Sequence, residues 1–262
     1  YDIKNDSVDQ AIYKQAKLLI SVDCGILAFE TARYAKSSGI DLIITDHHHP
    51  SHDGKIPECI AVVNPNRDDP DYPGEHFKEH AKPGFNRYGF DFLAGCGIAF
   101  KLMLGLVKHR KLNLMEYVDE LIEYAALGTV ADVAPMFDEN RMIVNYGCQR
   151  LSNSNKPGLR ELLRIANVKE VTTTSIGFQI GPRINAIGRI ADAGTALSLM
   201  LAEDTITATM LANTLDNANR KRQEQQEKAF AQAITLVEEQ YDLENDHIIV
   251  LGSDNWHPGL IF

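Results

Sequence analysis

The segment Asp46-His47-His48-His49 is the part of this sequence best suited to chemistry. It directly follows the apolar run 41–45, which predicts a buried strand. In open α/β sheets, ligand sites lie beyond the carboxyl ends of the strands. Carboxylates and imidazoles are costly to bury without a partner, so a metal ion or an anionic ligand is expected there. The alternative is a polar loop that is merely rich in histidine.

A second strand is expected to bring another carboxylate to the same place. Residues 17–22 form an apolar run that ends in Asp23, and residues 26–38 have the spacing of a helix that Gly39 closes. Strand, helix and strand in this order predict a βαβ unit with parallel strands. Parallel neighbours end at the same edge of a sheet, so Asp23 and His47 are predicted to lie close together.

Asp132 is a third candidate ligand. It ends the apolar, small-residue run that begins at Glu123, and Pro135 follows it shortly after. An isolated aspartate before a proline is usually a turn or cap residue. We nevertheless expect Asp132 to be the third ligand at a strand end, because two other donors already follow apolar runs.

The remaining pattern predicts an α/β protein: a parallel sheet with flanking helices, a long connector helix and the start of a second α/β domain. We expect a first domain over 1–203, the connector helix over 204–241, and the second domain over 246–262, opening with a strand at 247–252. Further elements are expected in the first domain: a strand near 59–65, a surface loop at 66–87, and helices at 92–108, 114–127 and 142–151.

Residues 181–189 form a second segment with chemical potential. Their glycines and Pro182 predict a rigid, tightly turned loop. The forked guanidinium groups of Arg183 and Arg189 could each grip a phosphate, which lysine cannot match. Asn185 could hydrogen-bond to backbone or substrate. One arginine could instead be a structural ion-pair partner, and we favour Arg189 for the phosphate.

Trp256 and His257 are candidates for contacts with a nucleic-acid strand. The indole could stack on a base and the imidazole could contact a phosphate. Trp256 could equally be a core residue.

The composition is that of an ordinary globular chain. It has 262 residues, 44% of them hydrophobic, and no apolar run of the roughly eighteen residues that span a membrane. Its four cysteines are scattered without a CxxC pair, which argues against a zinc knuckle and favours a reducing cytoplasm. The net charge of −10 argues against tight nonspecific duplex binding, although metals and a few arginines could still create a local site.

Six motifs together carry a family resemblance. The segments 22–25, 45–48, 126–132 and 181–189 occur in an order and spacing that resemble the DHH phosphoesterase superfamily and, within it, the RecJ-type single-strand-specific exonucleases. Residues 219–223 and 252–259 also resemble RecJ-type signatures. Other branches, such as family II pyrophosphatases, share only the first two motifs.

The resemblance implies a metal-dependent nuclease that trims single-stranded DNA from 5′ to 3′ in DNA repair and recombination. It implies a site for two Mn²⁺ or Mg²⁺ ions, with Asp23 bridging and with His47 and Asp132 as further ligands. His48 would contact the scissile phosphate, and Asp46 would fix a histidine or the strand tip. Single-stranded DNA is the expected substrate. A single-strand-binding protein and a helicase are candidate partners of a monomer that does not associate with membranes.

The sequence also departs from the family pattern. The family's first aspartate-x-aspartate motif would lie upstream of Tyr1, and the chain stops at Phe262 just inside the second, DHHA1-type domain. We therefore expect residues 1–262 alone to hold one divalent ion weakly and not to digest DNA. Two alternatives stay open: a phosphodiesterase for short oligonucleotides or cyclic dinucleotides, and a metal-less DNA-binding scaffold of the same fold.

Overall fold

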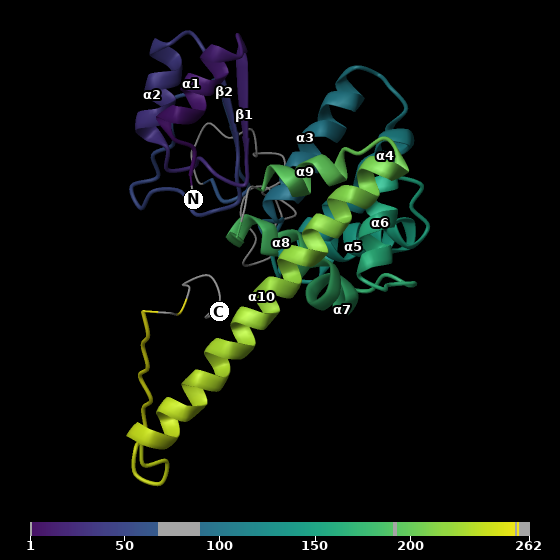
Figure 1. Cartoon of the computed structure of the whole chain (residues 1–262). Helices are drawn as coiled ribbons and strands as arrows, with labels where there is room; N and C mark the ends of the chain where they lie inside the picture. Colours follow the sequence, from purple (N-terminus) through teal and green to yellow (C-terminus); the bar gives the residue numbers. More distant parts are fainter. Residues whose placement is uncertain (1, 68–89, 191–192, 255, 257–262) are drawn as a thin grey trace. The chain divides into compact units, whose positions relative to one another are not determined.

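The computed structural model describes residues 2–67, 90–190, 193–254 and 256, without the side chains of 187–190. Contacts divide the chain into two compact units, 1–151 and 152–262. Figure 1 gives the element labels used below. The predicted loop at 66–87 falls mostly outside the described residues. Among the described helices, none is long and apolar enough to cross a membrane.

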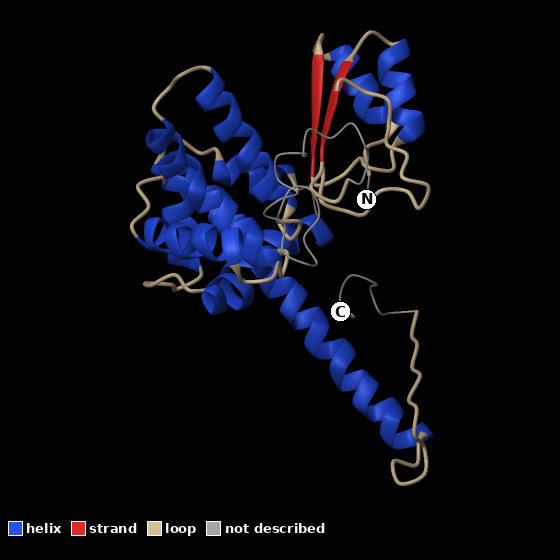
Figure 2. Ribbon diagram, turned by 180° about the vertical axis from the view of Figure 1, so that it is seen from behind, coloured by secondary structure: helices blue, strands red, loops and turns tan. Residues whose placement is uncertain are grey.

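The first unit contains a three-stranded parallel sheet in the order β1 (Leu18–Val22), β2 (Asp41–Thr45) and β3 (Ala61–Val63). Val22 is opposite Thr45, and Thr45 is opposite Val63. The three strands therefore end at one level, which confirms the parallel βαβ arrangement predicted from the apolar runs. Figure 2 shows the strands in red.

Two helices of the first unit share a core with the sheet. Helix α1 (Asn5–Tyr13) packs against α2 (Phe29–Ser37), and each also contacts a strand. Their small and branched side chains meet the sheet in one buried cluster that contains Val8, Ala35 and Ile44. Gly39 follows α2 with a φ of +71°, the left-handed conformation expected of a glycine at a helix end.

Three further helices complete the first unit: α3 (Gly95–His109), α4 (Leu114–Ala131) and α5 (Asp138–Ser152). Helix α3 packs against α4 and contacts β1 and β2. A Cβ atom at Gly128 of α4 would lie 2.5 Å from the Cys96 Sγ of α3. The glycine therefore allows the two helices to approach each other closely.

The expectation that Asp132 follows a strand is wrong. Residues 114–131 form one helix, and Asp132 is its C-cap. The run Tyr124–Ala131 contains three alanines and a leucine, and a short buried apolar run does not by itself separate helix from strand. Alanine and leucine are strong helix formers, and the helix simply continues four residues beyond the predicted end at Leu127.

The second unit is helical in its described residues. It contains α6 (Pro157–Ile165), α7 (Thr173–Ser175), a π-helical turn (Ile176–Ile180), α8 (Gly181–Ile190), α9 (Gly194–Met200) and α10 (Thr205–Gln240). The amino-terminal half of α10 packs against α6, α8 and α9 and buries Ala208, Ala212 and Leu215. Asp204 caps this helix by accepting the Thr207 N–H at 2.8 Å. The long helix predicted after Asp204 is confirmed, while the domain boundaries 1–203, 204–241 and 246–262 remain predictions.

Two other expectations in the second unit are wrong. Residues 181–189 are not a tight loop but most of α8. Pro182 suits the first turn of a helix, where its missing N–H costs nothing. Residues 247–252 do not form a strand (Figure 2). Ile248 and Val250 are exposed there, and no ladder in the described part of this unit is available to pair with them.

Candidate metal centre

Asp23 lies at the point where the chain leaves β1. It adopts a φ of +64°, a left-handed conformation that aspartate tolerates better than most residues. Its N–H donates to the Thr45 carbonyl at 2.9 Å, so the strand pairing extends to the ligand itself. Gly25, with a φ of +112°, then turns the chain where a Cβ would lie 3.0 Å from the Ser21 Oγ. These constraints fix the Asp23 carboxylate at the edge of the sheet.

His47 joins two carboxylates at this edge. Its Nε2 lies 3.0 Å from Asp23 Oδ1 and 3.8 Å from Asp132 Oδ2. The three side chains come from the ends of β1, β2 and α4. Sequence reasoning therefore predicted this convergence, although it assigned the wrong element to Asp132.

Asp46 is a positioning residue beneath the cluster. Its side chain is 1% exposed and accepts hydrogen bonds from the N–H groups of Ile26 (2.9 Å) and His47 (2.8 Å) and, at 3.2 Å, of His48. The carboxylate thereby ties the loop after β1 to the loop after β2. The expectation that Asp46 fixes the strand tip and a histidine is confirmed.

His48 is oriented by the same carboxylate. Its Nδ1 lies 2.6 Å from Asp46 Oδ1 and must be the donor, because an ionised carboxylate only accepts. Nε2 is therefore the nitrogen left for another partner on a side chain that is 60% exposed. Asp23, His47 and His48 each offer one ligand atom, and these atoms all lie within 4.8 Å of one another. A cavity of about 450 Å³ borders this group and is also lined by Asp2, Cys24 and Asp46.

Three positioning residues were missed by the sequence analysis. The buried Asn64 donates to the His48 carbonyl at 2.9 Å, and Asn66 donates to the His47 carbonyl. Both follow β3, so the reasoning applied to Asp23 and His47 would have found them. Gly95 begins α3, and a Cβ there would lie 2.3 Å from Asp23 Oδ1. No local sequence pattern predicts this contact, because Gly95 and Asp23 are far apart in the chain.

The charges of the cluster shift the pKa values of its members. The hydrogen bond to Asp23 raises the pKa of His47, and the nearby Asp132 adds to that effect against the opposing effect of burial. Burial raises the pKa of Asp132, and the Asp23 charge raises it further, although His47 works against both. Burial raises the pKa of the nearby Cys96 thiol to about 11, and this thiol donates to the Ala125 carbonyl at 3.5 Å.

The donors fit a divalent ion that prefers oxygen and accepts one or two nitrogens. Two carboxylates with imidazole suit Mn²⁺ or Mg²⁺, and Mn²⁺ matches the nitrogen better. Because the pKa values of His47 and Asp132 are raised, both side chains hold a proton up to a higher pH than they would in free solution, and a cation competes with these protons.

We predict that Mn²⁺ binding to this chain tightens as the pH rises. Below its raised pKa, His47 is protonated and paired with Asp23, so affinity should fall about tenfold per pH unit there. The stability of the ion-free protein should change in the opposite direction and fall as the pH rises. Its His47–Asp23 pair contributes stability that is complete below the ordinary histidine pKa of about 6.5 and is lost as pH rises through the higher folded value.

Calorimetry across this range would measure the affinity, and thermal melts would measure the ion-free stability. His49→Ala is the matched control, because His49 is exposed and adjacent in sequence. A Mn²⁺ affinity that does not change between about pH 5.5 and 8 would contradict the assignment of His47 as a ligand.

The candidate residues of the second unit have separate environments. Arg183 Nε lies 3.0 Å from Asp216 Oδ1, and its guanidinium also donates to the Gln179 carbonyl at 2.7 Å. Asn185 is exposed on α8. Trp256 Nε1 donates to Gln232 Oε1 of α10 at 3.0 Å. The side chain of Arg189 and the whole of His257 fall outside the described residues.

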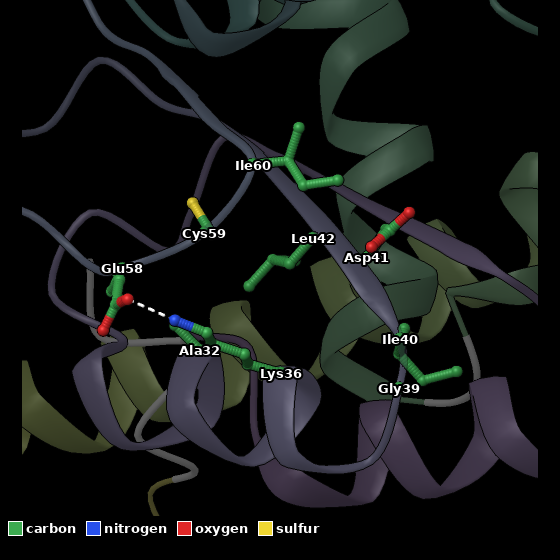
Figure 3. A pocket seen from close by; sticks show the side chains of 9 residues that line it. All are labelled: Ala32, Lys36, Gly39, Ile40, Asp41, Leu42, Glu58, Cys59 and Ile60. Carbon is green, nitrogen blue, oxygen red and sulfur yellow. Dashed lines mark hydrogen bonds and ion pairs between the residues drawn. The ribbon is translucent and has the colours of Figure 1, made fainter.

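Another cavity, of about 310 Å³, lies at the opposite end of β2 (Figure 3). Its charged groups include Lys36 and Glu58, which pair with each other. Its Cys59 thiol donates to the Ala61 carbonyl at 3.3 Å, and burial raises the pKa of this thiol. Neither a free pair of metal donors nor a reactive thiol lines this cavity, so the chemistry described above is at the other end of the sheet.

Comparison with known proteins gives a consistent result. A model described as "DHH family, N-terminal domain" matches residues 1–129. The single-stranded-DNA-specific exonuclease RecJ of Bacillus subtilis (strain 168) is 39% identical over 246 residues, which are 93% of this chain and 28% of that protein. RecJ of Escherichia coli (strain K12) is 33% identical over 278 residues, which cover 100% of this chain and 44% of that protein.

Solved structures agree with these relatives. The crystal structure of RecJ in complex with Mn²⁺ from Thermus thermophilus matches with a TM-score of 0.78 and 30% identity, over 98% of this chain and 35% of that one. A crystal structure of exonuclease RecJ bound to manganese matches with a TM-score of 0.76 and 31% identity, over 99% of this chain and 60% of that one. The chain thus spans less than half the length of the two curated relatives described above.

Proposed function

We propose that this chain forms the catalytic part of a metal-dependent exonuclease, because residues 1–129 match the DHH family's N-terminal domain and the chain is similar to RecJ exonucleases along its whole length. The proposed reaction is hydrolysis of phosphodiester bonds in single-stranded DNA from the 5′ end. The observation that carries the proposal is the convergence of Asp23 and Asp132 on one histidine nitrogen, 3.0 and 3.8 Å from it, at the edge of the sheet.

Asp23, His47 and Asp132 would hold Mn²⁺ or Mg²⁺. Two such ions, when bound, supply an activated water and neutralise charge on the phosphate. Asp23 would be one of these ligands, and its Oδ1 lies 3.0 Å from His47 Nε2.

His48 would bind the scissile phosphate. The buried Asp46 carboxylate accepts a hydrogen bond from His48 Nδ1 and so fixes the orientation of the imidazole ring. This leaves His48 Nε2 free to contact a phosphate. A protonated His48 could donate from Nε2 to a nonbridging oxygen while keeping its bond to Asp46. Asp46 thus acts through His48 and contacts no substrate itself.

The second unit would grip the strand. Arg183 already engages Asp216 and Gln179, which supports Arg189 as the arginine that binds phosphate with a forked geometry. Asn185 is exposed and available for a hydrogen bond. Trp256 would stack on a base, and His257 would contact a phosphate. A single-strand-binding protein and a helicase are proposed partners of a monomeric enzyme.

Digestion assays on the full-length protein would test this function. We expect release of nucleotides from the 5′ end of a single strand in Mn²⁺, little digestion of a blunt duplex of the same sequence, and no product after chelation. Separate 5′ and 3′ labels give the polarity. Equal digestion of the duplex, or faster cleavage of a cyclic dinucleotide than of the strand, would contradict the proposal.

A further inference from the structure

Five helices of the described chain end in the same hydrogen-bonded motif. In each, the residue after the C-cap has a positive φ and donates three residues back, while the next N–H donates five residues back. The left-handed residue is Gln15 after α1, Gly39 after α2, Lys111 after α3, Val133 after α4 and Asn167 after α6. At the end of α4 these bonds run from Val133 to Val130 (3.1 Å) and from Ala134 to Thr129 (3.2 Å).

Val133 is the one β-branched residue among these five. Glycine and asparagine are the usual choices there, and a β-branched side chain is a marked outlier at φ +56°. Burial of the side chain does not offset this backbone strain, because Val133 is 86% exposed. The folded chain alone therefore gives no reason for this residue, and backbone strain of this kind is concentrated at functional sites.

The position of Val133 supplies a reason. It directly follows Asp132, whose Oδ2 lies 3.8 Å from His47 Nε2. The buried Ala134 and the two hydrogen bonds of the motif hold it there. An exposed isopropyl group is thus held on the residue that directly follows a candidate ligand of the metal centre.

We infer that Val133 is a substrate-binding residue that makes an apolar contact with the deoxyribose or base of the nucleotide at the metal centre. This inference rests on the proposed function. A nucleotide whose phosphate binds at the metal centre beside Asp132 would bring its sugar and base close to Val133. The sugar and base of a nucleotide offer the apolar surface that an exposed valine can bury.

Two substitutions in the full-length protein separate contact from strain. Val133→Thr keeps the branched shape and the backbone strain but replaces a methyl group with a hydroxyl. Val133→Gly removes both the contact and the strain. Lys111→Gly is the matched control, because it relieves strain in the same motif at the end of α3. Steady-state digestion of a labelled single strand gives kcat and KM, and calorimetry gives the Mn²⁺ affinity.

We expect both Val133 variants to raise KM for the strand about fivefold or more, with a smaller fall in kcat and unchanged Mn²⁺ affinity. Val133→Gly and Lys111→Gly should both raise the thermal midpoint, and Lys111→Gly should leave KM unchanged. An active wild type whose KM is unaltered by both Val133 changes would overturn this inference alone. A wild type that digests no single strand would instead overturn the proposed function, and the inference with it.

Discussion

Replacing Asp132 by alanine should reduce hydrolysis of single-stranded DNA by the full-length protein more than about a hundredfold, because even residues that only support metal ligands cost about 10–100-fold when lost. The fold should survive, because the Asp132 side chain is 38% exposed. Asp132 is the C-cap residue of α4, and its side chain makes no hydrogen bond on which the sheet depends. Removal should even stabilise the protein slightly. A carboxylate at a helix C-terminus opposes the helix dipole, an effect of about 0.3–1 kcal/mol.

Asp41→Ala is the matched control for this change. Asp41 is exposed and begins β2, at the end of the strand remote from the cluster. Initial rates in Mn²⁺ and thermal midpoints should be measured for both variants. Near-normal rates for Asp132→Ala would remove Asp132 from the ligand set, and a large drop in its midpoint would give it a structural role instead.

Replacing Gly95 by alanine should weaken Mn²⁺ binding by at least about tenfold, although residue 95 offers no ligand atom. The new Cβ would lie 2.3 to 2.5 Å from the Oδ1, Cβ and Cγ of Asp23. Real Cβ atoms do not approach other atoms so closely, so either the start of α3 or the Asp23 side chain must move. Either movement changes the distance between Asp23 and His47.

Gly105→Ala in the same helix is the control. A Cβ at Gly105 would meet no atom within 4 Å, so alanine should stabilise α3 by up to about 1 kcal/mol and leave binding unchanged. Calorimetric Mn²⁺ titrations of both variants, with melts to verify folding, would measure the effect. Normal affinity in a folded Gly95→Ala variant would show that the site tolerates the shift.

The parallel sheet and most of the candidate ligands could be predicted from the sequence because their signals are local. Apolar runs of strand length end in Asp23 and in Asp46-His47-His48, and the intervening helix ends at a glycine. Parallel pairing then dictates a common edge. Asp46 was also expected to fix a histidine or the strand tip, and its bonds to Ile26 and His48 bear this out.

What could not be predicted depends on contacts between distant segments. Gly128 signals a break in a helix, but it lies inside α4 because Cys96 of α3 packs against it. Gly181-Pro182 is typical of a turn, yet it opens α8 directly after a π-helical turn. The run 247–252 has the composition of a strand, but composition cannot supply the neighbour with which a strand must pair.

The bonds of Asp46 also determine how the metal centre can open. One buried carboxylate accepts the N–H of Ile26 beyond β1 and those of His47 and His48 beyond β2. Detachment of the loop after β1 would leave the buried Oδ2 of Asp46 without its hydrogen-bond donor, so the two loops and the paired strands should open as one cooperative unit. The amides of these three residues would then exchange with solvent as slowly as the sheet itself, and an ion bound to the cluster would slow the exchange of the whole sheet.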